Sequence, residues 1–124
     1  MRNSTIPATN QVVPISGNYI FSEEDAVASI QATWAGGAVL LPGPDAGHNA
    51  PNNGDTYVIQ DGQNSLVNTG HPLTIVGGGY PFLSGGVMVM QTTLTSLVDT
   101  TNGPIQKSCL QFTFDAAARV WLVC

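Results

Sequence analysis

Charged residues are scarce in this sequence. Three Lys and Arg and eight Asp and Glu make up 9% of the 124 residues and give a net charge of -5 at pH 7. An average soluble domain carries about 25% charged residues. Because affinity for nucleic acid comes largely from clustered Lys and Arg, three scattered cations argue against a nucleic-acid partner. We expect instead a neutral, polar surface, rich in Gly, Pro, Asn, Thr and Ser.

Long apolar runs are also missing. The longest is AVLLP at residues 38–42, whereas a membrane-spanning helix needs about 20 apolar residues. Residues 1–20 lack the basic start and apolar stretch of a secretion signal. We therefore expect no membrane partner and synthesis in the cytoplasm of the producing cell. The length suits a single domain.

Motifs for metal binding and catalysis are missing too. The two Cys and two His do not show the paired spacing of a zinc site, and Asp45, Asp55 and Asp61 are too isolated for a calcium loop. No Gly-x-Ser-x-Gly elbow is present. The acids at 23–25 are explained by a helix start, where they complement the helix dipole. We expect no enzyme, no metal and no cofactor.

Short β-like runs separated by turn sequences fill most of the chain. Pairs such as Asn53-Gly54 and Asp61-Gly62 are typical of tight turns. The pattern predicts an all-β fold, a compact antiparallel sandwich or barrel-like roll. The sequence has no internal repeat of fixed period, which argues against a regular solenoid. The runs are AVLLP, DTYVIQD, PLTIVG, VMVMQTTLTSLV, CLQFTF and RVWLV.

Two segments near the N-terminus depart from this pattern. Residues 1–16 contain two prolines and no helical period, which predicts an extended N-terminal arm before a single β-rich domain at 17–124. The arm's apolar residues should lie on its own domain or on a neighbour. Residues 22–31, SEEDAVASIQ, predict the one short helix, because a serine can cap it, acids occupy its first turn, and Val27 and Ile30 share a face.

The C-terminal hairpin can be predicted in more detail. With DAAA (115–118) as its loop, one face is expected in the core, since side chains alternate along a strand. The other face is mixed in character and could meet a neighbouring subunit. The expected opposed pairs are Phe114 with Arg119, Phe112 with Trp121, Leu110 with Val123 and Cys109 with Cys124.

Opposed cysteines at the open end of this hairpin leave two alternatives. Cys109 and Cys124 could form a disulfide after release into an oxidising medium, because directly opposed strand positions can have suitable geometry. In a reducing cytosol they would remain two free thiols.

The glycine-rich segment TIVGGGYPFLSGG (74–86) does not match a phosphate-binding loop. No Lys is near it, and Phe82 stands where the third glycine of a dinucleotide-binding fingerprint would be. We interpret the glycines as permitting positive φ angles and close backbone approach at a turn. We also predict that this turn presents Tyr80, Pro81 and Phe82 to a neighbouring chain.

Four stretches together resemble a module that recurs in virion proteins of tailed bacteriophages. They are GNYIFSEEDAVASI, GGAVLLPGP, NGDTYVIQDGQNSLVNTGHPLTIVGGG and LQFTFDAAARVWLV. In that module an acidic, alanine-rich segment precedes a strand ending in Leu-Pro, and a Leu/Ile-Thr-Ile/Val strand is followed by glycines. The resemblance covers residues 17–124, although residues 83–108 contribute little to it.

This resemblance implies a capsid decoration, or cement, protein on the virion surface. Such a protein would bind the major capsid protein as a homotrimer and stabilise the head against the pressure of packed DNA. The arm would clamp adjacent coat subunits through Ile6, Pro7, Val12, Val13, Pro14 and Ile15. The self-association or partner surface would include Tyr80, Pro81, Phe82, Val120 and Leu122.

A second function is compatible with the same resemblance. The chain could be a tail-fibre or head-fibre module that binds a host-surface glycan, because aromatic side chains stack on the faces of sugars. The candidates for such stacking are Trp34, Tyr57, Tyr80 and Trp121. The sequence lacks the long repetitive shaft that a fibre needs, so we favour the hypothesis of a decoration protein.

Overall fold

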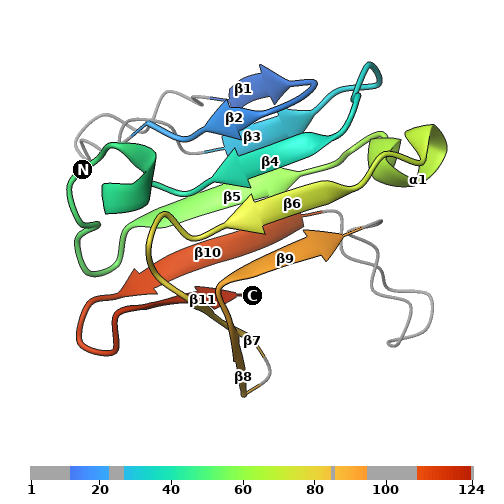
Figure 1. Ribbon diagram of the computed structural model, residues 1–124. Helices are drawn as coiled ribbons and strands as arrows, with labels where there is room; N and C mark the ends of the chain where they lie inside the picture. Colours follow the sequence, from blue (N-terminus) through green and yellow to red (C-terminus); the bar gives the residue numbers. More distant parts are fainter. Residues whose placement is uncertain (1–11, 23–26, 85, 95–108, 124) are drawn as a thin grey trace.

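Two β-sheets packed face to face form the domain (Figure 1). The computed structural model describes residues 12–22, 27–84, 86–94 and 109–123. The seven-stranded sheet has the order β1-β3-β5-β10-β11-β7-β8, and the four-stranded sheet has the order β2-β4-β6-β9. The all-β sandwich predicted from the sequence is confirmed.

The described elements are short. The seven-stranded sheet consists of β1 (Val12–Ile15), β3 (Val27–Ile30), β5 (Thr56–Gln60), β7 (Phe82–Ser84), β8 (Val87–Val89), β10 (Cys109–Asp115) and β11 (Val120–Val123). The four-stranded sheet consists of β2 (Tyr19–Ile20), β4 (Gly37–Leu40), β6 (Leu73–Val76) and β9 (Gln91–Leu94). A 3-10 turn, η1 (Pro44–Ala46), and one helix, α1 (Ser65–Thr69), complete the fold.

The first six strands alternate between the two sheets and wind into parallel coils. β1, β3 and β5 are parallel neighbours in one sheet, and β2, β4 and β6 are parallel neighbours in the other. Val12 pairs with Val27, and Val27 pairs with Val58, so each coil lies directly on the one before it. This is the arrangement of a short two-sheet solenoid. The expectation of antiparallel pairing without solenoid coils is therefore wrong for strands β1 to β6. The loops between these strands differ in length, so the coils do not appear in the sequence as a repeat of fixed period.

Antiparallel pairing completes the second half of the sandwich. β10 pairs antiparallel with both β5 and β11, and β9 pairs antiparallel with β6. β7 runs parallel to β11 and forms an antiparallel hairpin with β8, which is the last strand of its sheet. The predicted antiparallel architecture therefore holds for the strands that close the coils.

The helix predicted at residues 22–31 is wrong over its C-terminal part. Val27–Ile30 is strand β3, lying between β1 and β5. Ala28 and Ile30 are buried, while Val27 and Ser29 are half-buried, which is the two-residue period of a strand. Hydrogen bonding to two neighbouring strands outweighs the weak helix preference of this segment.

The one α-helix among the described residues is α1, at Ser65–Thr69. The buried carboxylate of Asp61 accepts hydrogen bonds from the backbone N–H groups of Ser65 at 2.7 Å and Leu66 at 2.9 Å. These bonds satisfy N–H groups that have no partner within the first turn. At the other end Gly70, with φ of 73°, terminates the helix in the left-handed conformation.

Aromatic side chains dominate the core between the sheets. Trp121 is fully buried, with its ring centroid 5.8 Å from that of Tyr57 and 5.1 Å from that of Phe114. Phe82 and Phe112 form a further pair at 5.5 Å. The four-stranded sheet contributes aliphatic residues such as Val39 and Ile75. The seven-stranded sheet thus supplies most of the large rings.

Candidate functional site

The residues expected in a coat-contacting arm divide into two groups. Ile6 and Pro7 lie outside the described residues, whereas residues 12–15 form β1, paired in parallel with β3. Ile15 is buried in the domain's own core, and Val12 at the outer end of β1 is 45% exposed. Residues 12–15 therefore belong to the sheet of the β domain rather than to a separate arm.

The glycine-rich segment forms a closely packed turn, as its sequence predicted. The indole N–H of Trp121 donates to the Gly77 carbonyl at 2.9 Å, and the Asp45 backbone N–H donates to the Gly78 carbonyl at 2.9 Å. Gly78 has a φ of 72°, and a Cβ there would collide with the backbone carbonyl of Leu41. The glycines thus permit two loops to touch through their backbones.

The aromatic residues that follow this turn point into the chain's own core. Phe82 is 1% exposed, and the ring of the half-buried Tyr80 packs edge-on against Phe114 with centroids 5.0 Å apart. Pro81 accepts a backbone hydrogen bond from Trp121 at 2.9 Å. The prediction that this group is presented to a neighbouring chain is wrong for Phe82, because the sandwich uses the ring to fill its interior.

The C-terminal hairpin pairs two residues away from the predicted register. Phe112 lies opposite Val123, and Phe114 lies opposite Trp121. A shift by two residues keeps every side chain on its predicted face, so the buried positions of Phe112 and Trp121 agree with the sequence interpretation. Arg119 accommodates the turn with a φ of 56°.

The new register also removes the predicted cysteine pair. Cys109 is exposed and lies opposite Gln60 of β5. Cys124 lies outside the described residues. The opposition of the two cysteines followed from pairing Phe112 with Trp121, and the structure does not have that pairing.

The two hairpin residues predicted to face a partner differ in their burial. Val120 is 2% exposed, so it is enclosed by the chain itself and cannot form a contact surface. Leu122 is half-buried. It pairs with Leu83 of β7, which pairs in turn with Met88 of β8. Paired positions share a face of a sheet, so these three side chains form an apolar row across three adjacent strands.

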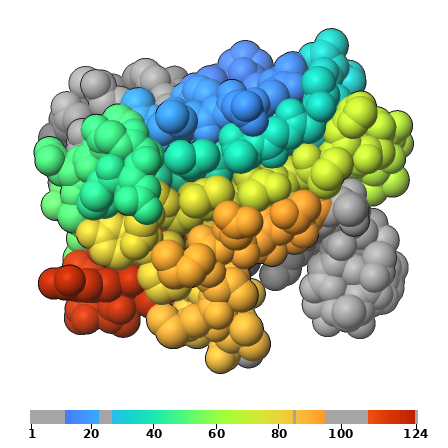
Figure 2. Space-filling view, in the orientation of Figure 1, coloured from blue at the N-terminus to red at the C-terminus, as the bar shows by residue number. Residues whose placement is uncertain are grey.

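This row continues onto an exposed apolar edge. Val87, Met88 and Met90 are 61%, 56% and 58% exposed, and β8 has no strand on its outer side within the described part of the chain. We call Leu83, Val87, Met88, Met90 and Leu122 together the β8 patch. The orange segment that contains β8 stands out at the lower edge of the molecule in Figure 2.

The sequence analysis treated the run that contains VMVM only as a strand. A strand that is apolar at every position is typical of burial on both faces. Here such a strand lies at a solvent-exposed edge instead. The signal was therefore present in the sequence, but only the sheet order shows that nothing in the described residues covers it.

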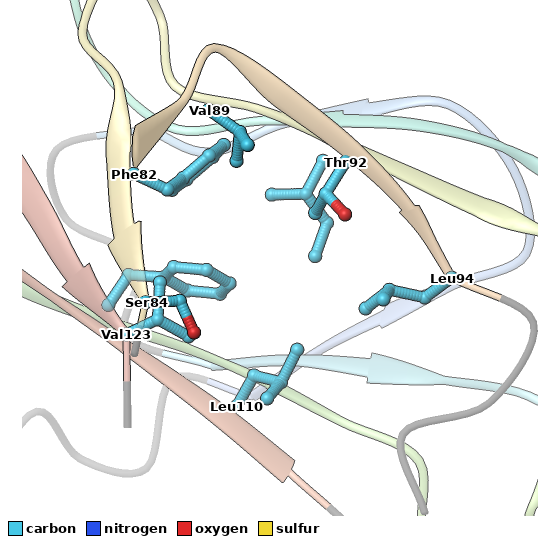
Figure 3. A pocket seen from close by; sticks show the side chains of 9 residues that line it. Phe82, Ser84, Val89, Thr92, Leu94, Leu110 and Val123 are labelled. Atoms are coloured by element: carbon cyan, nitrogen blue, oxygen red, sulfur yellow. The ribbon is translucent and has the colours of Figure 1, made fainter. Parts of the chain in front are cut away.

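An apolar pocket of about 160 Å³ opens between the sheets beside β8 (Figure 3). Phe82, Val89, Leu94 and Leu110 are among its lining residues, and Ser84 and Thr92 contribute the side-chain oxygens. The lining contains no titratable side chain. The pocket therefore has the composition of a packing or docking surface rather than that of a catalytic centre.

Most of the aromatic residues proposed to stack on sugars are not accessible. Trp34, Tyr57 and Trp121 are at most 3% exposed. The indole N–H of Trp34 donates to the carbonyl of His71 at 3.0 Å, which ties it into the fold. Of the four candidates only Tyr80 retains partial exposure.

Among the described residues, no group of three or more His, Cys, Asp or Glu side chains could hold a metal ion. No helix in the described part of the chain is long and apolar enough to cross a membrane.

No protein-family model matches the chain, and no curated protein sequence matches it significantly. The class defined by the described residues is an all-β two-sheet protein with parallel coils and an exposed apolar edge at β8.

Proposed function

We propose that the protein is a structural component of a bacteriophage virion, a decoration protein that binds the head lattice as a trimer and stabilises it against the pressure of packed DNA. The observation that best supports the trimeric form of this proposal is the β8 patch. Its three most exposed apolar side chains, Val87, Met88 and Met90, gather at one edge of the sheet, and exposed apolar clusters often mark interaction sites. The resemblance to phage virion modules identifies the kind of assembly in which such a partner would be found.

The mechanism would be physical rather than chemical. A decoration protein is present in many copies, each of which adds contacts between coat subunits. Linked binding sites gain avidity that a single contact lacks. The tightly packed core, with its interlocking rings around Trp121, supplies the rigidity that a mechanical brace needs.

The partner would be the major capsid protein, and the location would be the outer surface of the virion. We leave the buried Ile15 out of the proposed coat-contacting residues. We retain Ile6 and Pro7 in this role, together with the exposed Val12 and Pro14 of the edge strand β1.

Binding to heads tests this proposal directly. Expanded, undecorated heads of the parent phage are mixed with the full chain and sedimented, and we expect saturable co-sedimentation and greater resistance of the heads to heating. A variant without residues 1–11 is the matched comparison, because it leaves β1 and the buried Ile15 in place. That variant should bind more weakly. Failure of the full chain to bind would contradict the proposal.

A fibre module that binds a host glycan is the second candidate, and one observation favours it. Parallel coils such as those of β1 to β6 are the building unit of elongated solenoids, in which each repeat contacts its neighbours. A glycan array probed with the full chain and with Tyr80→Ala tests it. Binding that is lost in the variant would support this candidate, and no binding by the full chain would contradict it.

A further inference from the structure

We infer that the β8 patch is the surface through which copies of this chain associate with one another. The inference rests on the proposed function, which includes a trimer. It deepens that proposal by naming the surface through which the subunits of the trimer would touch. Its occupant is a second copy of the same chain rather than the coat protein.

The first argument is the state of the β8 backbone. Within the described residues β8 pairs with β7 alone, and the residue pairs are Phe82 with Val89, Leu83 with Met88 and Ser84 with Val87. The opposite edge carries backbone N–H and C=O groups that a strand of another chain can bind. Folded proteins usually protect such edges with charged residues, proline or a bulge. None of the β8 residues is charged or proline.

The second argument is that both faces of the strand are apolar. Met88 lies on the outer face, in register with Leu83 and Leu122. Val89 lies on the opposite face, next to the apolar pocket. A partner that lies along β8 therefore meets apolar side chains on both faces. Burial of the exposed part of these side chains would contribute about 25 cal/mol per Å².

The third argument is charge. The whole chain carries a net charge of -5, yet residues 62–98 contain no Asp, Glu, Lys or Arg. Two copies of an acidic protein repel each other wherever their acidic surfaces meet. At the β8 patch this repulsion is absent from the contact itself, so the patch is electrostatically compatible with another copy of itself. A basic or acidic partner would find no opposite charge on these residues.

Met88 and Met90 also suit a surface that must pack against its own copy around a symmetry axis. Methionine side chains are unbranched and adapt to irregular gaps. Residues near a symmetry axis meet their own equivalents, so flexible apolar side chains reduce the risk of a clash. The Figure 2 view agrees with this role, because the segment that contains β8 protrudes from the body of the domain.

Absolute mass measured by light scattering tests the inference without any capsid. The full chain should have a mass of at least twice the 12.9 kDa of one chain. Met88→Lys places a charge at the outer end of the apolar row, on the edge strand that the partner would cover, where burial of a charge without a partner is costly, and should weaken association by about 100-fold or more. Val67→Lys is the matched control, since Val67 is an exposed apolar residue of α1 with 49% exposure. It should keep the mass of the unmodified chain.

A second variant distinguishes weaker association from misfolding. Met88→Gln keeps the length of the side chain, adds no charge, and should weaken association less than Met88→Lys. Both variants should keep the circular dichroism spectrum of the unmodified chain, since position 88 is solvent-exposed in the single chain. The association should also persist when salt rises from about 0.1 M to about 1 M, which shortens the Debye length from about 10 Å to about 3 Å.

The outcomes separate this inference from the proposed function. A monomeric full chain, or a folded Met88→Lys variant that keeps the full mass, would overturn the inference. Loss of association at high salt would also overturn it, because the contact would then depend on charge. A dimer that Met88→Lys dissociates would support the β8 patch while contradicting the trimer of the proposed function. Binding to heads is measured separately and tests only the capsid partner.

Discussion

Replacement of Gly78 by Ala should destabilise the domain much more than replacement of Gly70 by Ala. The two glycines have almost the same backbone angle, with φ of 72° and 73°. They differ in their surroundings. A Cβ at Gly70 would meet nothing within 4 Å, whereas a Cβ at Gly78 would collide with the Leu41 carbonyl and lie 3.1 Å from the Gly43 nitrogen. The pair therefore separates the effect of the left-handed backbone from the effect of close approach.

The magnitude follows from these two terms. A non-glycine residue in the left-handed region costs about 1–2 kcal/mol, which is the full effect expected for Gly70→Ala. At Gly78 the atoms in the way belong to the backbone and cannot rotate aside. Separating the two loops adds about 1–3 kcal/mol of packing strain and weakens the hydrogen bond from the Asp45 N–H to the Gly78 carbonyl. We expect a total of about 2–5 kcal/mol for Gly78→Ala.

Urea unfolding followed by tryptophan fluorescence measures this difference, because Trp121 bonds to the same turn through Gly77. Both variants and the unmodified chain are compared at one protein concentration, since self-association makes apparent stability depend on concentration. The expected result is a lower midpoint for Gly78→Ala than for Gly70→Ala. Equal losses in the two variants would refute the close approach of the loops at Gly78.

Two further substitutions test the contacts that fix the turn and the helix. Trp121→Phe should lower the free energy of unfolding by at least about 1–3 kcal/mol, because the buried bond to the Gly77 carbonyl is lost and the smaller ring leaves part of the core unfilled. An unchanged urea midpoint would contradict this. Asp61→Asn should lower the free energy of unfolding by about 1–2 kcal/mol, because one of the two oxygens that accept from Ser65 and Leu66 becomes an NH₂ group. Amide hydrogen exchange in α1 should then become faster. Unchanged exchange there would contradict the capping role of Asp61.

The strands that the sequence predicted correctly are those with a clear two-residue period. Thr56–Gln60, Leu73–Val76 and Val120–Val123 fall within predicted runs, and Cys109–Asp115 exceeds its predicted run by one residue, Asp115. Their alternation is a local property and can be read without knowing the partners. The parallel pairing of β1 with β3 is not local, so it could not be read from the sequence.

Two wrong predictions near the N-terminus have separate physical causes. Pro14 made residues 12–15 look like an arm, but β1 is the edge strand of its sheet, where a missing N–H is tolerated. The acidic segment at 23–25 suggested a helix, yet Val27–Ile30 lies between two strands that satisfy its backbone. In both cases the neighbours in the sheet decided the structure.

The candidate site was found only in part. Leu122 was predicted to face a partner and does lie on the outer face with Leu83, whereas Val120 and Phe82 are buried. Alternation along a strand shows which residues share a face, but it does not show whether a loop or another strand covers that face. The exposed edge at Met88 depends on the order of strands in the sheet, which alternation does not reveal.

The position of β10 between β5 and β11 has a consequence for the order of events during synthesis. β10 and β11 come after all the other described strands in the sequence, yet they provide Phe112, Phe114 and Trp121, the rings against which the coils pack. A nascent chain that has exposed only β1 to β6 to solvent lacks these rings and leaves the outer edges of β5 and β6 unpaired. Pairings between distant parts of a chain form slowly and leave such edges open to aggregation. Completion of the core therefore waits until the β10–β11 hairpin has been synthesised.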